Sequence, residues 1–291
     1  MVGKVGPLTQ LRFFLRFLLP VFLSVCAISL KAQENGSKNA QGNQHVSWPQ
    51  PELLARDLRS ADDAIRRKAL HLVGVPAPNT PGKYAVPQPY EVQFRIIEMG
   101  KRSTDVAIVS LSLDISNLFA AVAIRVEDGW QRIATFHCWC KYERGDLLGQ
   151  FVNAETAEDG EQELIVRSSG GGTGIYEQNE SQFRLRGKEL RNVLSFVRLR
   201  QECPGGAGGD ETCHLERRIF SGTAEKGLSI LLETQGRIDP TKIPSVVFDE
   251  RDLQIQYTSP ISCKGLRWSE KDLRYVPAAL PRENPCQAKK K

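Results

Sequence analysis

The stretch Glu163-Leu-Ile-Val-Arg-Ser-Ser-Gly-Gly-Gly-Thr-Gly-Ile-Tyr176 decides the fold class of this chain. It begins with a short apolar run, Leu164 to Val166, and it leads into β-forming residues scattered among polar ones up to Leu185. The glycines between the two parts supply the positive φ angles that a chain reversal needs. The stretch therefore predicts a strand, a tight loop and a second strand. A phosphate-binding loop is the alternative, but the lysine and the helix that such a loop needs do not follow.

Similar hairpin patterns recur elsewhere in the chain. Phe183–Val193 resembles Leu266–Val276, because Lys-Glu-Leu-Arg in the first matches Lys-Asp-Leu-Arg in the second, and Ala123–Ile133 is a looser third copy around Glu-Asp-Gly. Further β-patterns cover residues 90–98, 106–114, 119–126 and 130–140. Recurrent hairpins predict a mainly β fold, either a small or incomplete propeller-like array or a sandwich.

A short helical hairpin is expected before this β-domain, over residues 51–74. Apolar residues recur there at helical spacing, and Ser60 with Asp62 forms a capping signal between two short helices. The segment resembles a single HEAT-type helical pair. Such a unit cannot bury its own apolar face, so the resemblance implies that it docks on the β-domain or on a partner.

The remaining segments complete the predicted domain organisation. Residues 33–50 are rich in Asn, Gln, Gly and Ser and predict a disordered linker. Five prolines in residues 75–89 predict an extended connector that isolates the helices from a β-domain at 90–280, and a basic tail follows at 281–291.

The N-terminus has the pattern of a signal peptide. Basic residues precede fourteen uncharged ones, Phe17 to Leu30, a run too short for a membrane-spanning helix, which needs about 20 residues. We expect residues 1–32 to be removed and the protein to be exported to the periplasm or the outside of the cell, with no membrane span after cleavage. An uncleaved signal anchor is the alternative.

Export changes the interpretation of the cysteines, because an oxidising compartment favours disulfides. Cys203 and Cys213 flank a glycine-rich loop and are expected to pair, and Cys263 is expected to pair with Cys286. Cys138 and Cys140 would lie about 6.6 Å apart on an extended strand. We therefore expect these two to bond elsewhere or to pack as thiols.

An acidic segment precedes the central hairpin. Glu155, Asp159, Gly160 and Glu163 match the pattern Asp-x-Asp-x-Asp-Gly-x-x-Glu, while Ala157 replaces one carboxylate. Over about forty residues around 151–193 the chain thus resembles a degenerate repeat of the FG-GAP and VCBS-like propeller families. The resemblance implies a β-repeat fold, and it makes Glu155, Asp159 and Glu163 calcium candidates. We expect an acidic turn that caps a strand pair and holds no cofactor, and bound calcium is the alternative.

No catalytic motif stands out. The net charge of +5 is spread along the chain, which argues against nucleic-acid binding. The leading hypothesis is an exported, non-catalytic β-domain that binds a protein or a cell-surface component. A hydrolase of envelope or extracellular polymers, using two carboxylates, is the alternative. A metal-binding protein using His137, Cys138 and Cys140 is a third hypothesis.

Overall fold

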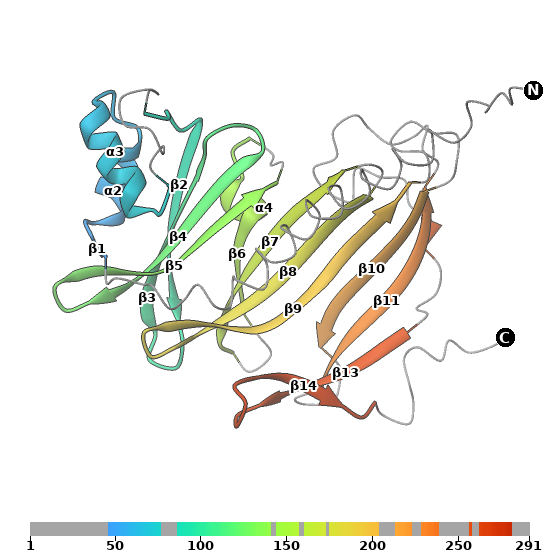
Figure 1. Ribbon diagram of the computed structural model, residues 1–291. Helices are drawn as coiled ribbons and strands as arrows, with labels where there is room; N and C mark the ends of the chain where they lie inside the picture. The colour runs from blue at the N-terminus through green and yellow to red at the C-terminus, as the bar shows by residue number, and fades with distance from the viewer. Residues whose placement is uncertain are drawn as a thin grey trace, which may run out of the picture. The chain divides into compact units, whose positions relative to one another are not determined.

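The computed structural model of this protein describes residues 46–76, 86–140, 144–156, 160–172, 175–203, 213–222, 228–238, 256–257 and 262–280. Over these residues the chain is mainly β, with two antiparallel sheets and few helices, and one sheet is curled into a half-barrel (Figure 1). The prediction of a mainly β fold preceded by a short helical hairpin is confirmed.

Sheet A has the strand order β1-β5-β4-β3-β2, and sheet B has the order β14-β13-β11-β10-β9-β8-β7-β6, with β12 beside β11. The helices are α2 (Pro51–Leu58), α3 (Asp63–Leu72) and α4 (Leu147–Phe151). The strands of sheet A are β1 (Ser47–Trp48), β2 (Glu91–Met99), β3 (Thr104–Ser112), β4 (Asn117–Val126) and β5 (Gly129–Trp139). The strands of sheet B are β6 (Val152–Thr156), β7 (Gln162–Gly172), β8 (Ile175–Arg186), β9 (Glu189–Glu202), β10 (Cys213–Gly222), β11 (Leu228–Ile238), β12 (Gln256–Tyr257), β13 (Ser262–Ser269) and β14 (Arg274–Ala278). Among the described helices, none has the length and apolar character needed to cross a membrane.

The centre of sheet A is buried on both faces. In β3, every residue from Val106 to Ser112 is buried. Successive side chains of a strand point to opposite faces, so a continuous apolar run needs a cover on each side. Ile108 belongs to a core that includes residues of sheet B, whereas Val109 belongs to a second core that includes residues of α2 and α3.

The helical hairpin provides that second cover. Leu54 and Leu58 of α2 are fully buried against the second face of sheet A. Asp62 caps α3, because its side chain accepts hydrogen bonds from the backbone N–H groups of Ala64 and Ile65, as the sequence predicts. Docking on sheet A therefore buries the apolar face of the helical pair, which an isolated pair would expose to water.

Residues 46–50, the last part of the predicted linker over residues 33–50, belong to the folded structure, and residues 33–45 lie outside the described part. Ser47–Trp48 pairs with β5, and the indole of Trp48 is buried and donates a hydrogen bond to the carbonyl of Leu72, 3.0 Å away. Arg132 of β5 donates to the same carbonyl at 2.6 Å. These contacts join the strand, the helices and sheet A in one core. The helices therefore pack against sheet A, while residues 77–85 of the expected connector lie outside the described part.

Sheet B carries the central glycine-rich hairpin. Strand β7 extends to Gly172, which pairs with Ile175. Gly170 to Gly172 therefore belong to the strand and not only to the turn that follows it. Residues 173–174 lie outside the described part. A Cβ atom on Gly171 would collide with the backbone of Ile175. Only glycine allows this close approach of the two strands.

Candidate functional site

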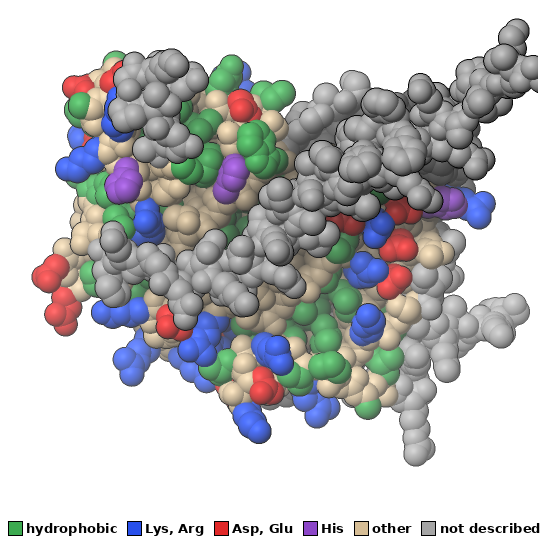
Figure 2. Space-filling model, viewed as in Figure 1, with side chains coloured by type: hydrophobic (Ala, Val, Ile, Leu, Met, Phe, Trp, Pro, Cys, Tyr) green, Lys and Arg blue, Asp and Glu red, His purple; other side chains and the backbone are tan. Residues whose placement is uncertain are grey.

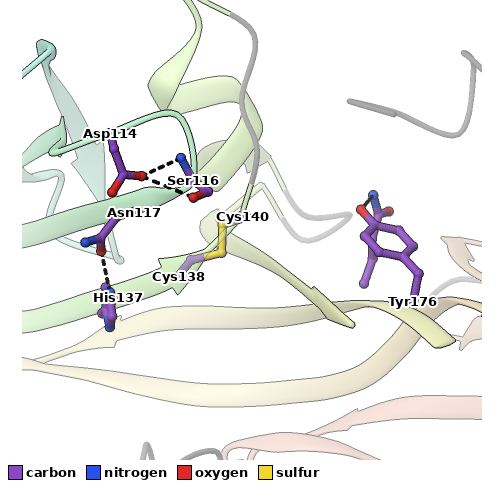
Figure 3. Close-up of a disulfide and its surroundings, with 8 residues drawn as sticks. Asp114, Ser116, Asn117, His137, Cys138, Cys140 and Tyr176 are labelled. Carbon is purple, nitrogen blue, oxygen red and sulfur yellow. Dashed lines mark hydrogen bonds between the residues drawn. A yellow bond between two sulfur atoms is a disulfide. The ribbon is translucent and has the colours of Figure 1, made fainter. Parts of the chain in front are cut away.

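Cys138 and Cys140 form a disulfide, so the expectation that they bond elsewhere or pack as thiols is wrong (Figure 3). That expectation assumed a fully extended chain. Strand β5 ends at Trp139, and the two Cα atoms lie 5.3 Å apart, within the range of ordinary disulfides. The bond also removes both thiolates that the metal-binding hypothesis requires.

The disulfide holds Trp139 in an exposed position. Both cysteines are buried in the core between the sheets. Trp139 lies between them in the chain, and its side chain is 65% exposed. Because neighbouring side chains on a strand point to opposite faces, anchoring the cysteines inward presents the indole outward.

The neighbouring His137 supports the exposed ring. Its imidazole stacks on Phe119 with ring centroids 4.3 Å apart, and it makes an edge contact with Trp139 at 5.5 Å. The imidazole Nε2 is 2.7 Å from Oδ1 of Asn117 (Figure 3). Partial burial lowers the pKa of His137, which favours the neutral ring.

Two more exposed apolar residues lie at the same end of sheet A. Asn117 is the register partner of Trp139, and its carbonyl accepts a hydrogen bond from Leu113 in the turn that holds Ile115. Across β3, the backbone N–H of Tyr90 donates to Ser112. Tyr90 and Ile115 are 76% and 70% exposed. We call Tyr90, Ile115, His137 and Trp139 the Trp139 surface.

A cavity of about 1110 Å³ lies at the opposite ends of β4 and β5, where Val126 pairs with Gly129. Its lining comes from the turns β2–β3, β4–β5, β8–β9 and β13–β14, and we call it the hairpin-tip cavity. The last three turns belong to the hairpins that recur in the sequence. The lining residues are Gly100, Lys101, Arg102, Thr104, Ile124, Arg125, Val126, Glu127, Asp128, Gln131, Leu185, Arg186, Gly187, Lys188, Glu270 and Leu273.

The structure describes two of the three calcium candidates. Glu155 and Glu163 are register partners on β6 and β7, whereas Asp159 lies outside the described residues. Glu163 is buried and ion-paired with Arg184 at 2.7 Å, and Glu155 lies 3.7 Å from Arg167. Within the described part of the chain, no group of three His, Cys, Asp or Glu side chains is arranged to hold a metal ion.

The other predicted disulfides reach beyond the described residues. Cys203 and Cys263 are each disulfide-bonded. The side chain of Cys213 and the whole of Cys286 lie outside the described part, so both pairings stay predictions. The register of β9 with β10 ends at the pair of Glu202 and His214, and continuing it by one residue would place Cys213 opposite Cys203. Residues directly opposite in an antiparallel pair have Cα separations that suit a disulfide.

The comparisons with known proteins are negative: no family model, curated protein or solved structure matches this chain. The resemblances to propeller repeats and to a HEAT-type pair therefore stay predictions. Sequence reasoning missed the Trp139 surface. Its signal was present in Cys138-Trp-Cys140, because two inward cysteines on a strand require an outward residue between them.

Proposed function

We propose that this protein is an exported, non-catalytic binding protein whose Trp139 surface contacts a protein or a cell-surface component. The observation that carries the proposal is the 65% exposure of an indole held between two disulfide-bonded cysteines. Exposed apolar groups gathered at one end of a sheet are typical of interaction sites. The signal-peptide pattern of the first 32 residues supports export.

The physical advantage of this arrangement is preorganisation. Tryptophan is among the residues that dominate binding energy at protein interfaces, and its side chain has few rotatable bonds to immobilise. The flanking disulfide and the His137 contact restrict the ring before binding. Less conformational entropy is then lost when the ligand arrives.

The charged groups give the hydrolase alternative less support. Of the carboxylates in the acidic segment that it would use, Glu161 pairs with Arg186 at 2.6 Å, and Glu163 pairs with Arg184. A general acid or base must reach the bond that it cleaves. Glu163 is instead buried, at 4% exposure.

The test measures retention of the full chain on two probes, the insoluble envelope fraction and the exported-protein fraction of the source organism. We expect Trp139→Ala to reduce binding to one of them at least about tenfold, as for a hot-spot aromatic residue. The matched control is Ile65→Ala, which also removes an exposed apolar side chain but from α3 (44% exposed). It should bind like the wild type.

Two results would reject the proposal. One is wild-type protein that is retained on neither fraction, and the other is equal loss of binding in both variants. Release of soluble fragments from the envelope fraction would instead favour the hydrolase.

A further inference from the structure

We propose that the hairpin-tip cavity binds an anionic amphiphile, that is, a ligand with a phosphate, sulfate or carboxylate group attached to a short apolar chain. The cavity and the Trp139 surface lie at opposite ends of β4 and β5, since Asn117 pairs with Trp139 at one end and Val126 with Gly129 at the other. The proposal is therefore independent of the function proposed above.

Four of the five basic side chains that line the cavity come from two turns that touch. A Cβ atom on Gly100 would lie 3.5 Å from the carbonyl oxygen of Leu185, which brings the β2–β3 turn against the end of β8. Lys101 and Arg102 follow Gly100, and Arg186 and Lys188 follow Leu185. Four cationic groups thus come from these two adjoining turns, and Figure 2 shows Lys and Arg side chains gathered at this end of the molecule.

Three of these cations are available to a ligand. Lys101, Arg102 and Lys188 are exposed, and no ion pair is found for them among the described residues. Arg186 is held by Glu161, and the fifth basic lining residue, Arg125, is held by Asp105 at 3.1 Å.

The carboxylates of the cavity lie on the other two turns. Glu127 and Asp128 belong to the β4–β5 turn, and Glu270 belongs to the β13–β14 turn. The lining is therefore polarised, with cations on one pair of turns and carboxylates on the other pair. An anionic group is expected on the cationic side, where lysine and arginine donate charge-assisted hydrogen bonds.

Apolar side chains lie between the charged groups. Ile124 and Leu185 are buried lining residues, and Val126 and Leu273 are half-buried. Ligand pockets of about 300–1000 Å³ are common, so about 1110 Å³ suffices for a charged group with a short chain. Val126 and Leu273 expose apolar surface to the cavity, and this surface would select an amphiphile over a free anion.

The backbone of the two kinds of turn supports a ligand site. Ser103 in the β2–β3 turn and Leu273 in the β13–β14 turn have φ angles of 46° and 50°. These are the two non-glycine residues with positive φ in the described part of the chain. Such backbone is unfavourable for a residue like leucine, and it is found preferentially at ligand and active sites.

The experiment is isothermal titration of the full chain with dihexanoyl phosphatidylglycerol below its micelle concentration. Glycerol phosphate supplies a phosphate anion without chains, and dihexanoyl phosphatidylcholine supplies the chains with a zwitterionic group. We expect saturable binding of the phosphatidylglycerol and at least about tenfold weaker binding of the other two, because each lacks one of the two interactions. Equal binding of glycerol phosphate would reject an amphiphile site, and equal binding of phosphatidylcholine would reject recognition of the anion.

Variants locate the site. The triple change Lys101→Glu, Arg102→Glu and Lys188→Glu should weaken phosphatidylglycerol binding at least about tenfold. The control Arg67→Glu, Lys68→Glu and Lys264→Glu alters the net charge equally at exposed positions outside the cavity. It should bind within about twofold of the wild type, as expected for distant screened charges. Equal losses in both triple variants, or no binding by the wild type, would overturn the proposal, and Trp139→Ala should leave this binding unchanged.

Discussion

The two sheets of this protein bury different kinds of side chain. In sheet A, β3 is buried on both faces, mainly through apolar side chains but also with Ser110 and Ser112, and the sheet is covered by the helices on one side and by sheet B on the other. Sheet B shares that core on one side through Leu164 and Leu185, but it also buries Glu163 and Arg184. One sheet depends on apolar burial, and the other adds ion pairs between its strands.

Buried charged side chains connect strands of sheet B, as buried apolar side chains do in sheet A. The guanidinium of Arg184 lies 4.1 Å from the ring centroid of Trp268 and 3.2 Å from the hydroxyl of Tyr275. Both aromatic residues belong to the last hairpin, so the contacts tie β13 and β14 to β7 and β8. Burying an ion pair costs desolvation, and removing one partner leaves the other charge uncompensated. Sheet B should therefore be sensitive to single charge deletions.

The largest expected effect tests the dependence of sheet A on its helical cover. Deleting residues 1–89 removes β1, α2 and α3 and exposes the face that carries Val109 and Leu111. We expect loss of the cooperative thermal transition by circular dichroism, because several buried side chains lose their partners at about 2–5 kcal/mol each. Deleting residues 1–44 is the control and should preserve the transition, since residues 45–291 form one compact unit. A cooperative transition in the longer deletion would show that sheet A does not need the helices.

The second prediction concerns the ion pair of sheet B. Arg184→Met should lower the free energy of unfolding by about 3–5 kcal/mol in urea titrations, because Glu163 stays buried without its partner. The double change Glu163→Leu with Arg184→Met should recover most of that loss. Arg125→Met, in the exposed pair with Asp105, should cost less than about 1 kcal/mol. Equal losses for Arg184→Met and the double change would refute the charge-based account of sheet B.

Removing a disulfide should lower the free energy of unfolding by less than the loss of the buried ion pair does. Replacing Cys138 and Cys140 by serine opens a loop of about three residues and should cost about 1.5 kcal/mol in the chain-entropy model. Replacing Cys203 and Cys213 should cost somewhat under 3 kcal/mol, because about ten residues lie in the closed loop. Unfolding midpoints measure both losses. Non-reducing peptide mapping tests the second pairing, and a free Cys203 or a bond to Cys263 would contradict it.

The smallest expected effect is a pH dependence of the protein's stability that is caused by His137 in sheet A. Burial holds the pKa of His137 below its ordinary value of 6.5, so the unfolded chain binds the proton more readily than the folded chain. The stability contribution is complete above about pH 6.5 and is lost as the pH falls through the lower folded pKa. An NMR titration should show the lowered pKa, and His137→Gln should weaken the acid-induced drop in melting temperature. A folded pKa above 6.5 would reverse the prediction.

Local sequence signals predicted many elements of this fold. The Asp-Gly turn at residues 128–129, the cap at Asp62 and the hairpin around the glycines each depend on residues close together in the chain. A turn type, a capping hydrogen bond and the period of a strand are local properties, so sequence patterns reveal them. The Cys138–Cys140 bond was missed because it depends on where β5 ends, and strand ends are set by pairing with neighbours.

Contacts between distant residues were decided only by the tertiary structure. Arg184 and Tyr275 are 91 positions apart, and Trp130 bonds to Gln50 across 80 positions. The convergence of the recurrent hairpins on one cavity and the exposure of Trp139 likewise depend on how the strands of each sheet align. The sequence by itself determined where the strands, turns and helix cap form, because those choices depend on neighbouring residues. Tertiary structure decided which side chains meet or stay exposed, because burial depends on packing between segments far apart in the chain.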